Sequence, residues 1–471
     1  MMSNIIQEEE EVAPNIRNFI KSLRDIGYSF EVAVADLIDN SITAKATNIN
    51  IYSVDNIFCI LDNGIGMDKL ELRESMRLAS KNPDDDRNKN DLGRFGLGLK
   101  TASFSQCKKL TVISKKNSEI NARQWDLDYI SKINKWSLIT PLNHNNLPLF
   151  NDLDKLKNGT LVVWEKFDEN TSNTENLEVL RKHISLVFHR FLEGADSFKR
   201  LSISINNNLI KPFNPFNINH SATQEISVEK IKIEAETIKI TPYILPHHSK
   251  LSSQEYEQYA TEVGYIKSQG FYLYRENRII IYGTWWGLHR ATDAHKLVRI
   301  KIDISNKMDK QWGIDIKKSS ARPSSNIKKA LKKIIELTTK KGSKPFTGRG
   351  NKIKDKTIDR FWDIKSVSKD EEFRFIINKE HPLFIELTYN FKGDKLKLIN
   401  LFMNGLEAYL PLDSIQAKLQ TNPKQIKQES ALTEDDVLEL ASTLKLAGLS
   451  KLEIDKWLKT EIFSKHKNIL D

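Results

Sequence analysis

The sequence predicts an α/β protein built as an α+β sandwich, and two kinds of pattern carry this prediction. The stretches at 15–26 and 30–46 repeat apolar residues at helical spacing. Short β-branched runs follow as INIYSV and FCILD, and strand-like runs return as KKLTVISKK, ARQWDLDYI and GTLVVWEKF. Helices and strands therefore share the first part of the chain, which is typical of a layered α+β domain.

The later elements indicate further domains. A helix is expected near 68–79 and a longer one at about 175–193. From about Leu201 the pattern changes to strands, and a basic amphipathic helix follows Pro323. The run KKGSKPFTGRGNK carries Gly, Pro and charge without an apolar period, as linkers do. We therefore expect three domains, at 1–195, 196–345 and 346–471, the last of them mostly helical.

The composition excludes several classes of protein. The chain has 471 residues, of which 39% are hydrophobic and 28% charged, as in ordinary globular proteins. Its two cysteines, Cys59 and Cys107, cannot form a disulfide framework, and the first residues lack a signal-peptide pattern. No apolar run approaches the roughly 18 residues that span a bilayer. We expect a cytoplasmic protein without a membrane segment.

The positive charge is concentrated in one segment. The chain carries 72 Lys and Arg and 62 Asp and Glu, a formal net charge of +10. Residues 266–350 hold 20 basic and 6 acidic residues, a net charge of +14, which leaves −4 for the remainder. Such a segment is the electrostatic footprint expected for a polyanion, so we expect DNA contact through 266–350 that is not sequence-specific. A solvated lysine-rich surface is the alternative.

Aromatic residues interleave with these charges. They stand close together in the sequence at Tyr272, Tyr274, Tyr282, Trp285 and Trp286. Stacking on nucleic-acid bases is one role for such a cluster, and packing inside the protein is the other.

Three polar residues of the stretch 30–46 fall on one helix face. Asp36, Asp39 and Asn40 are three and four residues apart. A carboxylate beside an amide suits a hydrated magnesium ion together with an attacking water. A polar helix end without a ligand has the same pattern, so this face is not specific by itself.

Two glycine motifs follow. DNGIGM (Asp62 to Met67) comes directly after a strand, so Asp62 can accept a hydrogen bond from an exocyclic amine while Gly64 and Gly66 leave room for a flat ring. LGRFGLGLKTA (Leu92 to Ala102) is typical of a phosphate-binding turn that leads into a helix N-terminus. The chain has no GxxxxGK[ST] motif, so a Walker A site is excluded.

Taken in order and spacing, these blocks resemble the GHKL ATPases. This Bergerat-fold group includes gyrase B, MutL, MORC proteins, the ninety-kilodalton heat-shock chaperones and sensor histidine kinases. Its N-box is ADLIDNSITA here, its adenine motif is DNGIGM, its lid-and-phosphate motif is LGRFGLGLKTA, and its later Gly-Thr element is NGTLVVW. The resemblance implies a prokaryotic protein of the MutL/MORC-like branch, with a Bergerat domain over 1–195 that has a mixed sheet and helices on one face.

The resemblance also implies residues for ATP and Mg²⁺. Asn40 would be the magnesium ligand that bridges the phosphates, Asp62 would accept from the adenine amino group, and Thr160 would support that contact through water. Asp36 stands where most ATPases of the group carry a glutamate general base. Aspartate is one methylene shorter, so we expect slow hydrolysis. The other implied nucleotide contacts are Gly64, Gly66, Met67, Gly93, Arg94, Phe95, Gly96, Leu97, Gly98, Leu99 and Lys100.

The segment 196–345 resembles the transducer domain that follows the ATPase in gyrase B, MutL and MORC proteins. YRENRIII resembles a strand of that domain, and WGIDIKKSSARP resembles the loop that returns a lysine to the γ-phosphate. We assign Lys318 to this role, with Lys317 as the alternative. A cation from a second domain can sense whether the γ-phosphate is present.

The expected function is Mg-dependent ATP binding and slow hydrolysis that close a homodimer through its N-terminal domains, coupled to DNA in repair, restriction or anti-phage defence. The region 346–471 has no nuclease motif that we could name, so it is expected to dimerise or dock a partner, and a separate nuclease or helicase is a possible partner. Two alternatives stay open. One is a chaperone-like ATPase that remodels a protein client, and the other is an ATP-dependent switch with little turnover.

Overall fold

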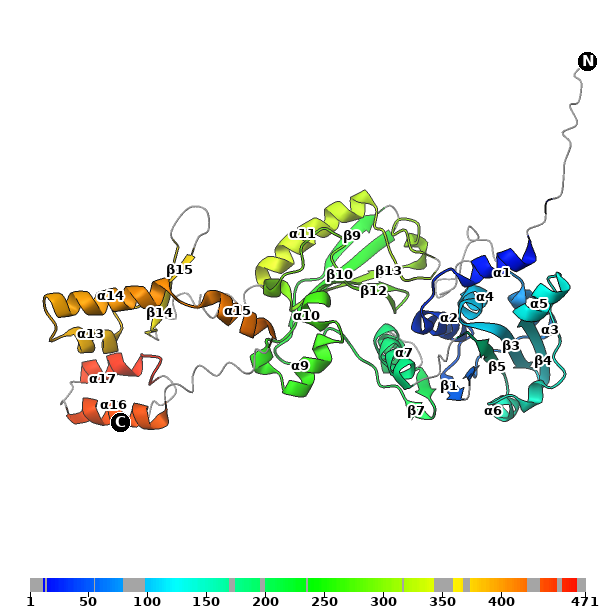
Figure 1. Ribbon diagram of the computed structural model, residues 1–471, viewed down its shortest axis with the longest axis horizontal. Coiled ribbons are helices and arrows are strands. Elements are labelled where there is room, and N and C mark those ends of the chain that lie inside the picture. Colours follow the sequence, from blue (N-terminus) through cyan, green and yellow to red (C-terminus); the bar gives the residue numbers. More distant parts are fainter. Residues whose placement is uncertain are drawn as a thin grey trace, which may run out of the picture. The chain divides into compact units, whose positions relative to one another are not determined.

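In the computed structural model the chain forms two compact units. Figure 1 labels their helices and strands. The first comprises Met1–Leu245, Val263–Ala291 and Val298–Ile335, and the second Pro246–Glu262, Thr292–Leu297 and Glu336–Asp471. The structure describes residues 12, 15–54, 56–78, 98–168, 174–194, 200–233, 236–315, 317–342, 359–366, 373–421, 433–446 and 451–463.

The first sheet of the first unit is mixed and has seven strands in the order β4-β3-β5-β2-β1-β6-β7. Its strands are β1 (Asn48–Val54), β2 (Ile57–Asp62), β3 (Cys107–Lys116), β4 (Glu119–Asp126), β5 (Gly159–Phe167), β6 (Ser202–Ile205) and β7 (Asn208–Leu209). Neighbours are antiparallel except β1 and β6, which are parallel. Because β6 and β7 pair in this sheet, the sheet continues past the boundary that we expected at 195/196.

Alternation along the strands gives this sheet two apolar faces. In β2, Phe58 and Ile60 join the core under the helices, whereas Cys59 and Leu61 join a smaller core on the opposite side. The smaller core is covered by the segment with α6 (Phe150–Lys155). The helices that contribute to the larger core, on the other face, are α1 (Ile16–Arg24), α2 (Phe30–Thr43), α3 (Lys69–Met76), α4 (Gly98–Gln106), α5 (Leu127–Ile133), α7 (Thr174–Val187) and α8 (His189–Glu193).

The second sheet of the first unit has the order β12-β11-β13-β10-β8, and β9 pairs with β10. Its strands are β8 (Gln224–Glu225), β9 (Glu229–Ile233), β10 (Glu236–Ile244), β11 (Gly270–Arg275), β12 (Arg278–Thr284) and β13 (Val298–Ile304). One face packs under α11 (Ser325–Gly342), whose Ile327, Leu331 and Ile334 share a core with the sheet. The other face packs against Leu186 of α7, which joins the two sheets within the unit.

The structure divides the interleaved aromatic and basic residues between interior and surface. Tyr272, Tyr274 and Trp285 are buried in the second sheet, so they pack in the core. Three arginines of the basic segment are also buried: Arg275, Arg278 and Arg299. The exposed charge includes Lys329, Lys332 and Lys333, which lie on α11 opposite its apolar face.

The second unit is mostly helical. Its core is formed by α16 (Glu434–Leu446), by α17 (Lys451–Leu458), which includes Trp457, and by residues that follow α17, among them Phe463. Its other elements are α9 (Ser253–Ala260), β14 (Trp362–Ser366), β15 (Phe373–Ile377), α13 (Pro382–Thr388), α14 (Asp394–Ala408) and α15 (Leu412–Thr421). Within the described residues, no helix combines the length and apolar character needed to cross a membrane.

Candidate functional site

A cavity of about 340 Å³ in the first unit brings the expected site residues together. Its walls come from α2, the end of β2, the start of α4, strands β3 and β5, and the loop that follows β13. Its size is typical of a small-molecule site. The lining includes Asp36, Asn40, Asp62, Gly66, Met67, Gly98, Leu99, Lys100, Thr160 and Lys318. Five expected residues lie outside the described part of the chain: Gly93, Arg94, Phe95, Gly96 and Leu97.

One part of the cavity wall is built around Asp62, the last residue of β2. Its Oδ2 accepts a hydrogen bond from the Ser41 hydroxyl at 2.8 Å, and its Oδ1 accepts one from the Gly64 amide at 2.8 Å. Burial raises the pKa of Asp62 despite these bonds. Val112 and Val162 supply an apolar wall nearby. The arrangement suits a flat heteroaromatic ring that carries an amine.

The two glycines of the adenine motif are required by neighbouring backbone. A Cβ at Gly64 would lie 2.8 Å from the carbonyl oxygen of Ala44. Gly66 has φ +68°, and a Cβ there would lie 2.0 Å from the carbonyl oxygen of Lys115. Protein backbone therefore occupies the space on the Cβ side of each glycine, while Gly66 also lines the cavity.

Ser114 of β3 connects the motifs, although nothing in the sequence pattern marked it. Its Oγ accepts the Met67 amide at 2.8 Å, donates to the Gly159 carbonyl at 3.0 Å and lies 3.0 Å from Thr160 Oγ1. Thr160 stands opposite Asp62 in the β2–β5 register and opposite Ser114 in the β3–β5 register. This pairing places Thr160 beside Asp62.

Helix α2 carries an acidic face beside the cavity. Asp36 and Asp39 are buried, whereas Asn40 is exposed and lines the cavity. The Tyr28 hydroxyl donates to Asp36 Oδ2 at 3.0 Å. Burial and then the charge of Asp36 raise the pKa of Tyr28, so the phenol stays protonated and acts as a donor.

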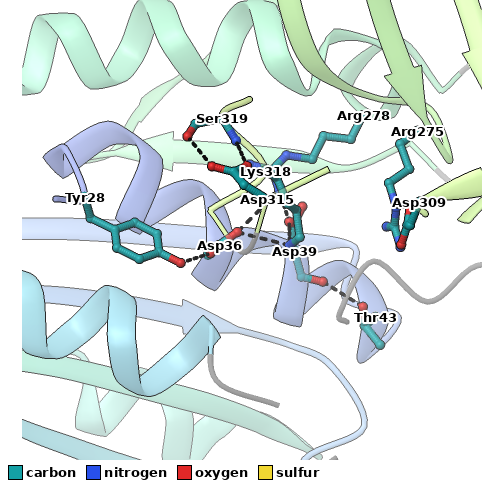
Figure 2. Close-up of polar contacts among 10 residues, drawn as sticks. All are labelled: Tyr28, Asp36, Asp39, Thr43, Arg275, Arg278, Asp309, Asp315, Lys318 and Ser319. Carbon is teal, nitrogen blue, oxygen red and sulfur yellow. Dashed lines mark hydrogen bonds and ion pairs between the residues drawn. The ribbon is translucent and has the colours of Figure 1, made fainter. Parts of the chain in front are cut away.

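Two cations from the second sheet and its following loop meet this acidic face. Lys318 Nζ donates to Asp36 Oδ1 at 3.0 Å and to Asp39 Oδ2 at 2.6 Å. Arg278 Nη1 donates to Asp39 Oδ2 and lies 3.4 Å from Asp36 Oδ1. Figure 2 shows both cations pointing toward the two carboxylates of α2. Two positive and two negative side chains thus form one charge-balanced cluster.

The lysine loop has a local cause for its shape. The Asp315 carboxylate accepts the Ser319 amide at 2.8 Å and the Ser320 amide at 3.0 Å. This turn holds Lys318 at φ +52°, a conformation that non-glycine residues seldom adopt. The neighbouring Lys317 differs, because its Nζ donates to the carbonyl oxygens of residues 26 and 27 at 3.3 and 3.1 Å. The turn therefore directs only Lys318 of this adjacent pair into the cavity.

A tight hairpin presents two arginines to the same region. Glu276 and Asn277 connect β11 to β12, and both have positive φ, as in a type I′ turn. Arg275 and Arg278 therefore face each other across the two strands. Arg275 forms a buried two-bond pair with Asp309, at 2.7 and 2.9 Å, and both residues line the cavity. No recognised motif assigned a role to Arg275, Arg278 or Asp309.

The start of α4 closes the cavity beside Asp36. An ideal Cβ at Gly98 would lie 3.6 Å from Asp36 Oδ2, so the backbone here approaches the carboxylate closely. Lys100 is buried, lines the cavity and donates from Nζ to the Ser75 carbonyl at 2.8 Å. The N-terminal amides of a helix are suited to phosphate oxygens.

The donors present fit magnesium better than a transition metal. The described residues contain no group of three or more His, Cys, Asp or Glu that could hold a metal by themselves. Magnesium commonly takes one or two protein oxygens and completes its shell with waters and substrate phosphates. The Asn40 side chain on the cavity wall can supply such an oxygen.

The comparisons with known proteins identify the class of domain that this geometry defines. Residues 28–160 match the family described as histidine kinase-, DNA gyrase B-, and HSP90-like ATPase, so the chain contains a GHKL ATPase domain. A more particular similarity is to the ATPase MORC2B of Mus musculus, at 32% identity over 99 residues. That match covers 19% of this chain and 9% of MORC2B, and it supports a MORC-like ATPase domain.

Proposed function

We propose that the protein binds ATP with Mg²⁺ in the 340 Å³ cavity and hydrolyses it slowly. One observation carries the proposal: the buried acceptor Asp62 lines the same cavity as Asp36 and Asn40. The matched ATPase family over 28–160 supports it.

Each part of the cavity would bind one part of the nucleotide. Asp62 would accept a hydrogen bond from the adenine amino group, while Val112 and Val162 would contact the ring. Asn40 would hold magnesium, and the amides at the start of α4 would bind phosphate oxygens. Magnesium, when bound, neutralises phosphate charge.

Asp36 would serve as the general base, and Lys318 would bind the γ-phosphate. In the structure both Asp36 and Asp39 accept hydrogen bonds from Lys318. A γ-phosphate is a competing anion for this lysine. Transfer of Lys318 to it would remove one of the three donors that contact Asp36, and the carboxylate could then accept a proton from water while Tyr28 and Arg278 stay in contact with it. Hydrolysis would then return the lysine to the carboxylates.

A pair of adjacent lysines tests this role. In Lys318→Met we expect ATP affinity to fall about 10- to 100-fold, since bonds to charged groups contribute about 1.5–3 kcal/mol, while ADP affinity changes little. Lys317→Met is the matched control, because its amine contacts main-chain carbonyls. Calorimetric titration with ADP and with a non-hydrolysable ATP analogue measures both. Equal losses in the two variants would contradict the assignment.

We also propose that α11 contributes to a DNA-binding surface. Its Lys329, Lys332 and Lys333 are exposed, and its apolar face is buried against the second sheet. Phosphate neutralisation by such lysines gives binding that does not depend on base sequence. DNA repair, restriction or anti-phage defence is the proposed setting, with a separate nuclease or helicase as a possible partner.

Charge reversal on α11 tests the DNA contact. The triple variant Lys329→Glu, Lys332→Glu and Lys333→Glu should bind duplex DNA more weakly and lower the slope of log K against log salt by about 0.9 for each phosphate that the helix no longer neutralises. The control reverses two exposed lysines of the α5 region, Lys132→Glu and Lys135→Glu. Fluorescence anisotropy at several salt concentrations gives the slope. An unchanged slope in the α11 variant would remove this helix from the proposal.

We further propose a cytoplasmic protein in which ATP promotes dimerisation of the N-terminal domains, while the region 346–471 provides dimerisation or partner docking. Cys59 and Cys107 are buried and unpaired, which suits a reducing compartment. Light scattering with and without a non-hydrolysable ATP analogue measures the dimer.

A second candidate function is an ATP-dependent switch with little turnover. The observation that favours it is the engagement of Asp36 by Tyr28, Lys318 and Arg278. A carboxylate held by three donors is not free to accept a proton from water. Tight ATP binding with no phosphate release would support the switch, and steady phosphate release would support the enzyme.

A further inference from the structure

A buried arginine of the second sheet contacts the acidic face of α2 without lining the nucleotide cavity. Arg278 Nη1 donates to Asp39 and lies 3.4 Å from Asp36 Oδ1. Among the described residues that line the nucleotide cavity, Arg278 does not occur. It lines a separate cavity of about 270 Å³, together with Glu31 and His183. We therefore expect Arg278 to influence the hydrolysis of a bound nucleotide by its contacts with Asp36 and Asp39.

If Lys318 leaves the cluster, Arg278 is needed to balance the charge of Asp36 and Asp39. The side chains of Asp36, Asp39, Arg278 and Lys318 are 2%, 1%, 4% and 10% exposed. A buried carboxylate without a cation is strongly unfavourable. If Lys318 leaves for a γ-phosphate, Arg278 is the cation of this cluster that stays with both carboxylates.

The pair of Arg278 and Asp39 can strengthen after that change. In the described part of the chain, Asp39 Oδ1 and Arg278 Nε have no hydrogen-bond partner. Each is buried, so each is a polar atom that gains from a partner. A small rotation of either side chain would let the guanidinium bind the carboxylate through two bonds, as arginine commonly does.

The hairpin tip holds Arg278 in place. The Glu276 carboxylate accepts the Asn306 amide at 2.9 Å, and Asn277 Oδ1 accepts from Arg190 at 2.9 Å. The Arg278 guanidinium carbon lies 5.4 Å from the centre of the Phe188 ring. Burial, followed by the charge of Arg278, lowers the pKa of His183 to about 3, so this neighbour stays neutral and adds no third cation.

We propose that Arg278 is a positioning residue for Asp36. It holds Asp39, and with it Asp36, in the orientation for catalysis while Lys318 binds the γ-phosphate. The inference rests on the proposed ATPase function. Because Arg278 acts after the nucleotide has bound, its loss lowers kcat while affinity for ADP stays nearly constant.

Three variants of the full chain at Arg278, together with the single variant Asp39→Asn, test the inference. In Arg278→Met we expect kcat to fall on the order of tenfold or more, because Asp36 and Asp39 lose the cation that remains with them when Lys318 moves. ADP affinity should stay within about twofold, since Arg278 does not line the cavity. Arg278→Lys keeps a cation and should recover part of kcat. In the double variant Asp39→Asn with Arg278→Met, the neutral amide needs no cation, so kcat should exceed that of Arg278→Met alone.

The control is Arg181→Met on α7, whose ion pair with Glu178 is at the surface. Thermal melting by circular dichroism accompanies each measurement. If Arg278→Met does not fold, kcat of wild type is compared with that of Arg278→Lys and of the double variant, in which the net charge is unchanged.

Two results would overturn the inference while wild type hydrolyses ATP: unchanged kcat in Arg278→Met, or losses from Asp39→Asn and Arg278→Met that simply multiply in the double variant. A wild type that binds ATP without hydrolysing it would instead overturn the proposed hydrolysis, and this inference with it.

Discussion

Replacement of Asp36 by Asn is expected to lower ATP turnover by about 10²- to 10⁴-fold, which is the usual contribution of a positioned general base. Asparagine keeps the size of the side chain and can still accept a hydrogen bond from Tyr28 or Lys318, but it cannot take a proton from water. Because adenine would bind at Asp62, which is a different residue of the cavity wall, ADP affinity should change much less than kcat. Phosphate release measured alongside calorimetric ADP binding separates the two quantities.

The matched control for this change is Glu31→Gln. Glu31 lies in the first turn of the same helix, and its carboxylate accepts the Ser29 hydroxyl at 2.6 Å. It does not line the nucleotide cavity among the described residues. Turnover should therefore survive in Glu31→Gln. If Glu31→Gln lost turnover and Asp36→Asn kept it, Glu31 and not Asp36 would be the general base.

Replacement of Asp62 by Asn is expected to weaken ATP and ADP binding by about 10- to 100-fold, since a hydrogen bond to a charged acceptor contributes about 1.5–3 kcal/mol. The amide has a single acceptor oxygen, and both Ser41 and Gly64 already donate to this side chain. The preference for ATP over GTP should shrink in parallel, because guanine lacks the exocyclic amine at the adenine position. Competition titrations with ATP and GTP measure this preference.

Asp152→Asn is the control for the Asp62 variant. Asp152 is at the surface of α6 and pairs with Lys155 at 3.2 Å. Its neutralisation changes the total charge by the same amount without touching the cavity. An Asp62→Asn protein that is folded and binds ATP as tightly as this control would show that adenine lies elsewhere.

The sequence was most informative where function depends on local spacing. Three residues of α2 share a face because a helix repeats every three to four residues, so Asp36, Asp39 and Asn40 could be grouped without a structure. Asp62 could be placed at a strand end because β-branched residues precede it and glycines follow. The GHKL domain that these motifs implied is confirmed by the family match over 28–160.

Contacts over long distances along the chain could not be read in this way. Arg278 reaches Asp39 across 239 residues, and no periodic pattern records such a contact. The choice between Lys317 and Lys318 depends on a turn held by Asp315, in which Lys318 takes a positive φ. Adjacent lysines look alike in sequence, so only the backbone conformation separates them.

Sequence patterns also could not predict that β6 belongs to the edge of the first sheet. Strand β6 is four residues long and pairs in parallel with β1, about 150 residues earlier in the chain. A strand this short carries little alternation, and its partner depends on the whole fold. For this reason we expected it in the following domain.

The central claim is that the α2 and β2 cavity is the site of Mg-dependent ATP hydrolysis. Its most direct test is a single-turnover measurement in which excess wild-type protein is mixed with radiolabelled ATP, with Mg²⁺ or with a chelator. We predict conversion to ADP and phosphate that requires Mg²⁺ and is absent from Asp36→Asn. Saturating ATP binding without any conversion in the presence of Mg²⁺, or equal conversion by wild type and Asp36→Asn, would contradict the claim.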